Sequence, residues 1–208
     1  MALDSYSNLK AAVIDWSHRN DIADKLDDFI AVAEQSMFSN PLMPLQLRQM
    51  ETRATATLTA GEMFLALPDG YLDMRRLKIS LASGDYEVVF KAPAEIETSN
   101  IAGIPAYFTV TSQVEFDRPA SDDYSVEMQY FAKPTGLSSS NTTNTILASH
   151  STAYLYGTLW AVFVWSGDDI KEQQYLSRFL GAIEGINKEY TRGRFGPAPV
   201  MRMKGSFP

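Results

Sequence analysis

The sequence predicts an α+β protein in which N- and C-terminal helices form a helical bundle, with an inserted antiparallel β domain and an extended C-terminal arm. Apolar residues recur every three or four positions near both ends of the chain and alternate in the middle, and the last 18 residues are rich in proline and glycine. With 208 residues, of which 45% are hydrophobic, the chain can bury a core in one domain or two small ones. The expected parts are a helical bundle (1–49 and 144–190), a sandwich- or barrel-like β domain (50–134), a linker (135–143) and the arm (191–208).

Two amphipathic helices are predicted before residue 40. Ser7 is the expected N-cap of the first helix, which carries Leu9, Val13 and Trp16 at helical spacing. The sequence "SNPLMP" should end the second helix, because proline cannot continue it. The apolar face of the second helix consists of Leu26, Phe29, Ile30, Ala33 and Met37. Its charged face consists of Asp21, Asp24, Lys25 and Asp28, and it is expected to be solvated because no glycine-turned calcium loop accompanies it.

The hydrophobic period changes near residue 50. The stretch "METRATATL" (50–58) alternates in character, and "EMFLAL" (62–67) follows after a short turn, which predicts a β-hairpin. Further strands are expected at 86–92, 106–112, 113–117 and 124–132. Turn sequences such as "PDG", "ASGD" and "RPASDD" separate the strands at a spacing typical of a small sandwich or barrel.

Helical spacing returns after the polar stretch "KPTGLSSSNTTN" (133–144). The first helix is expected from Thr145 to Trp165, and its apolar run is too short to cross a membrane. Asp169 and Glu172 fit a capping box that opens the second helix. The apolar stripe of that helix consists of Ile170, Leu176, Phe179, Leu180, Ile183 and Ile186.

No motif for catalysis, metal binding or cofactor binding is found. The chain lacks cysteine, and neither His18 nor His150 lies in an HExxH motif or beside a GxSxG nucleophile elbow. The glycines form no phosphate-binding loop or dinucleotide fingerprint. Paired acids could serve a glycosidase, but turns and helix caps explain the candidate pairs, Asp122 with Asp123 and Asp168 with Asp169. We therefore predict no enzymatic activity, no metal site and no cofactor.

Charge is distributed unevenly along the chain. The net charge is −7, and residues 191–208 contain four basic residues and no acidic residue, so residues 1–190 carry −11. This acidity disfavours nucleic-acid binding as the main function, because neutralising phosphates requires clustered lysine and arginine. The N-terminus has neither the basic nor the apolar region of a secretory signal, so none is expected.

Three stretches in order resemble the bacteriophage head-to-tail adaptor family. They are "SYSNLKAAVIDWSHRNDIADKLDDFIAVAEQSM", the pair "METRATATL" and "FLALPDGYLDMRRLKI", and "STAYLYGTLWAVFVWSGDDIKEQQYLSRFLGAIEGIN". The resemblance implies a structural virion protein of the phage neck, assembled in the host bacterial cytoplasm without membrane contact. It also implies a ring, typically of twelve subunits, between the portal protein and the tail nozzle or next neck protein. Packaged DNA would pass through this ring without sticking to it.

Under this resemblance, the basic C-terminal arm is expected to bind the portal. Eighteen extended residues could reach roughly 60 Å, enough to cross neighbouring subunits. Arginines suit portal carboxylates, and apolar side chains suit a groove. The expected portal-binding residues are Arg192, Arg194, Phe195, Pro197, Pro199, Val200, Met201, Arg202, Met203, Lys204 and Phe207.

Alternatives to this reading stay open. The arm could be an ordinary disordered tail without a partner. The protein could be a sugar- or receptor-binding virion or tail module that recognises its ligand through the β domain, or, as a third reading, a hydrolase that uses paired acids. A symmetric ring with helical subunit contacts would favour the adaptor, whereas a monomer or trimer with exposed aromatic residues on the β domain would favour the binding module.

Overall fold

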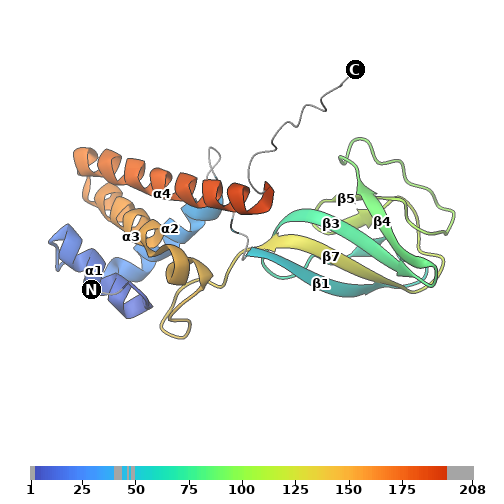
Figure 1. Ribbon diagram of the computed structural model, residues 1–208, viewed down its shortest axis with the longest axis horizontal. Helices are drawn as coiled ribbons and strands as arrows, with labels where there is room; N and C mark the ends of the chain where they lie inside the picture. The colour runs from blue at the N-terminus through green and yellow to red at the C-terminus, as the bar shows by residue number, and fades with distance from the viewer. Residues whose placement is uncertain (1–2, 40–43, 46, 48–49, 196–208) are drawn as a thin grey trace, which may run out of the picture. The chain divides into compact units, whose positions relative to one another are not determined.

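The computed structural model describes residues 3–39, 44–45, 47 and 50–195. The chain falls into two compact units, which are shown in Figure 1. One is a helical unit formed by Met1–Arg48 and Thr135–Pro208, and the other is a β unit formed by Gln49–Pro134.

Four α-helices make up the described part of the helical unit: α1 (Tyr6–Ser17), α2 (Leu26–Ser39), α3 (Thr145–Ser166) and α4 (Asp169–Phe195). A short 3-10 helix, η1 (Ala23–Lys25), precedes α2. Helix α3 is central, because it packs against each of the other three α-helices. It also contains a kink at His150, whose φ of −138° and ψ of 51° are not helical.

Helices α2, α3 and α4 meet at Gly157. A β-carbon added there would lie 2.8 Å from the ring of Phe179 on α4 and 3.2 Å from the β-carbon of Ala33 on α2. The backbone of α3 therefore approaches both neighbours more closely than any larger residue would permit. All five apolar residues that the helical spacing assigned to the buried face of α2 are buried in the structure.

Two of the predicted helix caps are displaced by one or two residues. Helix α1 is capped by Ser5, not Ser7. The Ser5 hydroxyl oxygen accepts a hydrogen bond from the backbone N–H of Asn8 at 3.3 Å. Helix α4 is capped by Asp168, whose Oδ1 accepts a hydrogen bond from the backbone N–H of Lys171 at 3.2 Å, so the cap is not Asp169. The error arises because several capping residue types stand next to each other at both places.

A buried carboxylate fastens the segment that was predicted as a linker. Glu34 is 8% exposed, and its Oε1 accepts hydrogen bonds from the Tyr154 hydroxyl and the Leu137 backbone N–H, each at 2.8 Å. Asn144 donates to the Tyr154 hydroxyl at 2.7 Å and caps α3 by accepting from the N–H of Leu147 at 2.9 Å. Burial, and after it the negative charge of Glu34, raises the pKa of the Tyr154 hydroxyl above its ordinary value. This network ties the start of α3 to α2.

The β unit holds one seven-stranded sheet in the order β1-β7-β3-β4-β5-β6-β2. The strands are β1 (Glu51–Leu58), β2 (Phe64–Leu65), β3 (Tyr71–Leu81), β4 (Gly84–Phe90), β5 (Tyr107–Val110), β6 (Val114–Phe116) and β7 (Tyr124–Ala132). Strands β1 and β2, at the two ends of this order, also contact each other, so the sheet nearly closes into a barrel.

The chain is α+β, but the predicted description, a helical bundle with an inserted antiparallel β domain, is wrong. The sheet is mixed, because β4 and β5 run parallel, with Val89 opposite Tyr107. Parallel neighbours need a connection of about a dozen residues or more. The segment 91–106 is long enough to return the chain to the end of the sheet where β5 must begin for a parallel pair. The alternation of residues within the strands does not reveal whether two strands run parallel or antiparallel.

The predicted hairpin of 50–58 with 62–67 is also wrong. Strand β1 pairs with β7, and β2 pairs with β6. The longest described strand, β3, was not predicted, because charged residues interrupt its alternation. In the structure, two irregularities also shift its register against β7. Strand partners lie far apart along the chain, so local sequence does not select them.

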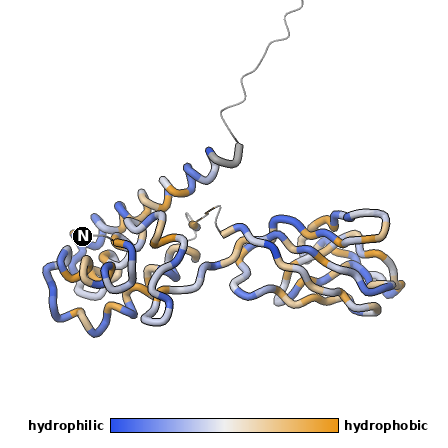
Figure 2. Tube along the Cα trace, turned by 60° about the horizontal axis from the view of Figure 1, so that its bottom comes forward, coloured by the Kyte–Doolittle hydropathy of each residue, from blue (hydrophilic) through white to orange (hydrophobic). Residues whose placement is uncertain are grey.

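Alternating side chains of the strands fill the interior of the β unit. The largest fully buried members are Phe116, Leu58, Leu77, Ile79 and Met128. The alternation of hydrophobic and hydrophilic residues along the strands can be followed in Figure 2.

Candidate interaction surfaces

The predicted portal-binding residues begin on a helix. Helix α4 continues to Phe195, so the expectation of an arm extended from residue 191 is wrong for Arg192, Arg194 and Phe195. Gly193 lowers helix stability by only about 1 kcal/mol, and the first helix-breaking proline comes at position 197. The other predicted residues lie outside the described part of the chain: Pro197, Pro199, Val200, Met201, Arg202, Met203, Lys204 and Phe207.

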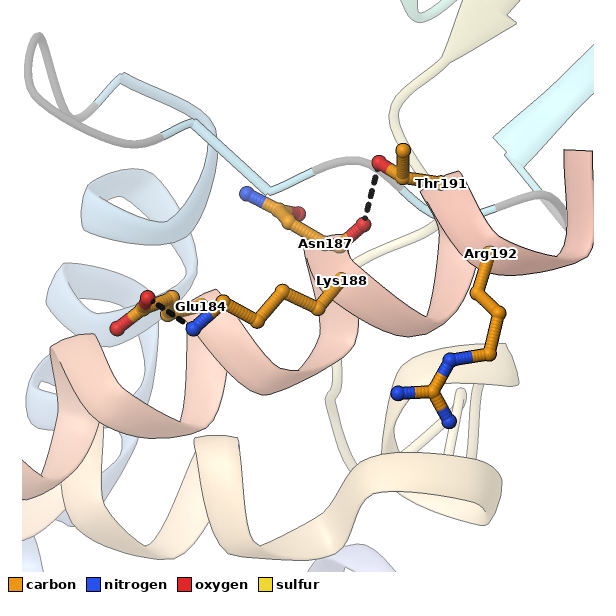
Figure 3. Close-up of a pocket in the computed structure, with 5 residues that line it drawn as sticks. All are labelled: Glu184, Asn187, Lys188, Thr191 and Arg192. Carbon is orange, nitrogen blue, oxygen red and sulfur yellow. Dashed lines mark hydrogen bonds and ion pairs between the residues drawn. The ribbon is translucent and has the colours of Figure 1, made fainter. Parts of the chain in front are cut away.

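The last described turns of α4 border a shallow depression of about 500 Å³ (Figure 3). Lys188 Nζ lies 2.5 Å from Glu184 Oε1, and the Thr191 hydroxyl donates to the backbone carbonyl of Asn187 at 2.9 Å. The exposed Arg192 side chain points away from these residues in Figure 3. Its charge is therefore presented to solvent at the point where α4 leads into residues 196–208.

A wholly apolar groove of about 320 Å³ lies between α2 and α3. We call it the Trp165 groove, and its lining residues are Phe29, Val32, Trp160, Ala161, Val164 and Trp165. Val32, Val164 and Trp165 are each more than 40% exposed. These three exposed apolar side chains gather in one hollow, which makes the groove a candidate surface for a protein contact.

Two cations flank Trp165 at one end of this groove. Lys25 Nζ lies 4.4 Å, and the Arg19 guanidinium carbon 5.3 Å, from the centre of a Trp165 ring. Arg19 also pairs with Asp21 at 2.6 Å, and this hydrogen-bonded pair lowers the pKa of the Asp21 carboxyl. This end of the groove therefore combines an exposed indole with the charge of Lys25, since the charge of Arg19 is paired with that of Asp21.

A second candidate surface is the connection between β4 and β5, which we call the 91–106 loop. Asp117 is 3% exposed and accepts hydrogen bonds from the backbone N–H groups of Ala106 and Tyr107, at 2.9 and 3.1 Å. Arg118 Nε donates to its other oxygen at 2.9 Å. A buried carboxylate with three donors therefore fixes the end of this loop where it enters β5.

The middle of the 91–106 loop is also anchored. The N–H of Ser99 donates to the carbonyl of Asp117 at 2.7 Å, and that of Gly103 donates to the carbonyl of Pro119 at 2.9 Å. Between these two anchors, Ile101 is 78% exposed. The loop thus presents a large aliphatic side chain on a supported backbone.

Exposed apolar residues continue from the loop onto β4 and β5. Val89 and Tyr107 are direct neighbours across the parallel pair, and Phe90 is 56% exposed. Lys91 Nζ lies 3.8 Å from the centre of the Tyr107 ring. Because successive side chains of a strand point to opposite faces, Val89 and Tyr107 lie on one face of the sheet and Phe90 on the other.

The comparison with protein families decides what kind of molecule carries these surfaces. A family model described as SU10 adaptor protein matches residues 4–202, nearly the whole chain. The chain belongs to this family. It is a family of bacteriophage head-to-tail adaptors, so the resemblance seen in the sequence is confirmed and the chain is a structural component of the virion. None of the curated proteins compared with the chain matches it.

The described residues of this adaptor contain no group of three or more histidine, acidic or cysteine side chains that could hold a metal ion. No helix among them is long and apolar enough to cross a membrane. The paired acids serve local structure, since Asp168 caps α4 and Asp123 accepts a hydrogen bond from the N–H of Ala60 at 2.8 Å.

The 91–106 loop of this adaptor was not predicted as a site. Of the residues that line the Trp165 groove, the sequence singled out only Trp160 and Trp165, as part of an aromatic cluster that suits the core, a subunit interface or sugar stacking. Trp165 stood at the end of an apolar run that was expected to be a buried helix, and Ile101 stood in a segment without periodicity. One signal was available for the loop: residues 93–104 combine three isoleucines with two glutamates and no basic residue. An apolar, acidic connection of this length is typical of a binding loop.

Proposed function

We propose that this adaptor forms a ring, of twelve copies under the resemblance, that joins the portal to the tail nozzle or next neck protein and surrounds the DNA exit channel. The observation that carries the proposal is the match to a head-to-tail adaptor family along residues 4–202. The exposed apolar surfaces on both units support it, because a neck protein must hold several protein partners at once. The proposed role needs no cofactor and no catalysis, and assembly would take place in the host bacterial cytoplasm.

We propose that residues 196–208, which follow α4 in the chain, bind the portal. Arg202 and Lys204 would speed encounter with acidic portal surfaces, while the methionine and phenylalanine side chains would slow release. Pro197 and Pro199 favour an extended backbone, which lowers the entropy lost on binding. Arg192 extends the same basic character onto the exposed end of α4.

Truncation after Phe195 tests this role. The described helices remain complete in the truncated chain, so circular dichroism and Tm should stay close to those of the full chain, while binding to the purified portal of the same phage should be lost. As a second variant, Arg202→Glu with Lys204→Glu should weaken binding more at 50 mM than at 300 mM salt, because salt screens exposed charges. If the truncated chain occupies portals as fully as the intact chain, the proposed role of residues 196–208 is wrong.

The net negative charge of residues 1–190 is suited to the wall of a channel through which DNA must pass without binding. Their net charge of −11 would place like charge next to the phosphates and prevent adhesion during ejection. The truncated chain should show no salt-dependent binding to duplex DNA in fluorescence anisotropy at about 0.15 M salt. Measurable, salt-sensitive binding would argue against a DNA-lining role.

A second candidate is a sugar- or receptor-binding virion module. It is favoured by the exposed aromatic residues Tyr86, Phe90 and Tyr107 on neighbouring strands, which could stack on sugar rings. Mass photometry with and without the portal separates the two candidates. Rings on the portal favour the adaptor ring, whereas a monomer or trimer that binds a glycan array favours the module.

A further inference from the structure

We infer that the Trp165 groove of one copy receives the 91–106 loop of the next copy in the ring. The inference rests on the ring proposed above and assigns the surfaces that close it. A ring of identical subunits needs two different surfaces per chain, because each subunit meets its two neighbours with different faces. This chain presents a concave apolar surface and a separate loop with apolar side chains.

The groove is suited to accept an aliphatic side chain. Its lining is wholly apolar, and Phe29 and Trp165 are in ring contact with their centres 5.8 Å apart. Val32 and Val164 supply the remaining exposed apolar surface around the hollow. Filling this hollow would remove apolar surface from water and complete the packing between α2 and α3.

The loop is suited to be the occupant because its shape is already set. The hydrogen bonds to Asp117 and Pro119 hold the backbone on both sides of Ile101, so little conformational entropy remains to be lost when it docks. Ile101 is the most exposed large apolar side chain of the β unit, and Ile104 follows it at 43% exposure. Ile101 therefore makes little contact within its own chain and is available to a partner.

The charges of the two surfaces are complementary at one end. Glu95 and Glu97 are exposed on the loop, and Arg19 and Lys25 flank Trp165 in the groove. Arg19 is paired with Asp21, so Lys25 is the cation beside Trp165 that the loop glutamates would meet. This pairing would give the docked loop a direction, with its glutamates toward Trp165.

Disulfide cross-linking tests the contact, and the absence of native cysteine means that only introduced thiols can react. Chains carrying Val164→Cys and chains carrying Ile101→Cys should cross-link to each other when mixed and oxidised, and neither should dimerise alone. A chain with both substitutions should give a ladder of linked subunits on a non-reducing gel. Val164→Cys dimers formed without the second variant would indicate a symmetric contact and overturn the inference.

Charge variants give an independent test. Lys25→Glu should weaken self-association by about three- to tenfold, as should Glu95→Lys with Glu97→Lys, and combining all three in one chain should restore it. Asp28→Lys is the matched control, because it adds a positive charge beside the same groove and should leave association unchanged or tighter. Analytical ultracentrifugation of the full chain gives the constants, and circular dichroism checks the fold of each variant.

The outcomes separate this inference from the ring itself. Rings that form on the portal while the mixed cysteine chains fail to cross-link would overturn the loop-in-groove contact and leave the proposed function standing. Cross-linked chains that never bind the portal would support the contact and contradict the head-to-tail role.

Discussion

Replacing Glu34 with alanine should destabilise the helical unit strongly, because this residue joins elements that are distant in sequence. Its Oε1 accepts from the Tyr154 hydroxyl and from the N–H of Leu137, both at 2.8 Å, inside the packed helices. Alanine would leave both donors buried without an acceptor. The segment after β7 would then lose its attachment to α2.

The magnitude follows from these two hydrogen bonds. Each hydrogen bond to a charged group contributes about 1.5–3 kcal/mol to stability. Part of this loss is offset, because the variant no longer has to remove a carboxylate from water when it folds. We expect a loss of roughly 3 kcal/mol in the free energy of unfolding. For a chain of this size, that corresponds to a Tm lower by about 10 °C.

Chemical and thermal denaturation, followed by circular dichroism, measure the effect. Tyr154→Phe removes one of the two donors and should cost about half as much, and the double variant should show a coupling energy of about 1–2 kcal/mol. Glu189→Ala, at an exposed position on α4, is the control and should change stability by less than about 0.5 kcal/mol. A loss below about 1 kcal/mol for Glu34→Ala, or purely additive effects in the double variant, would refute the reasoning.

Two further predictions concern local features of the helices. Gly157→Ala should destabilise by about 1–3 kcal/mol, because the added β-carbon would lie 2.8 Å from the Phe179 ring, whereas Gly181→Ala meets nothing within 4 Å and should stabilise α4 by about 0.5–1 kcal/mol. Urea denaturation of both variants would contradict this if the two changes had the same sign. Hydrogen bonds from the backbone and side chain of Lys171 hold the pKa of Asp168 below its ordinary 3.8, so its stabilising effect is complete above that pH and is lost as the pH falls through the lowered value. Asp168→Asn keeps the capping oxygen without the titrating charge, so Tm should fall less steeply between about pH 5 and 2, and an unchanged slope would count against the capping role.

The elements with strong local periodicity were predictable. The apolar residues of α2 and the alternation of β1 and β7 follow from side-chain spacing, which depends only on neighbours in the chain. Strand β3 was missed because Asp73, Arg75 and Arg76 interrupt its alternation, although Leu77 and Ile79 are fully buried. The pairing of β1 with β7 joins Glu51 to Phe131, a separation that no local pattern encodes.

The candidate surfaces were less predictable than the elements. The basic, proline-containing residues 196–208 stand out in the sequence by composition alone. The Trp165 groove does not, because the same apolar run of α3 contains the fully buried Leu159 and the exposed Val164. Which residues of this apolar run remain exposed depends on where α1, α2 and α4 cover α3.

The sequence by itself determined the helical and strand character of most segments, the acidic body with its basic C-terminus, and the adaptor family, because these properties are carried by residue order and type. Only the tertiary structure decided that β4 and β5 run parallel, that Glu34 is the acceptor for Tyr154 and Leu137, and that Ile101 and Trp165 remain exposed. Each of these depends on contacts between residues far apart in the chain. Their free energy comes from excluding water and satisfying buried donors, which is set by the assembled neighbours of a residue and not by its own chemistry.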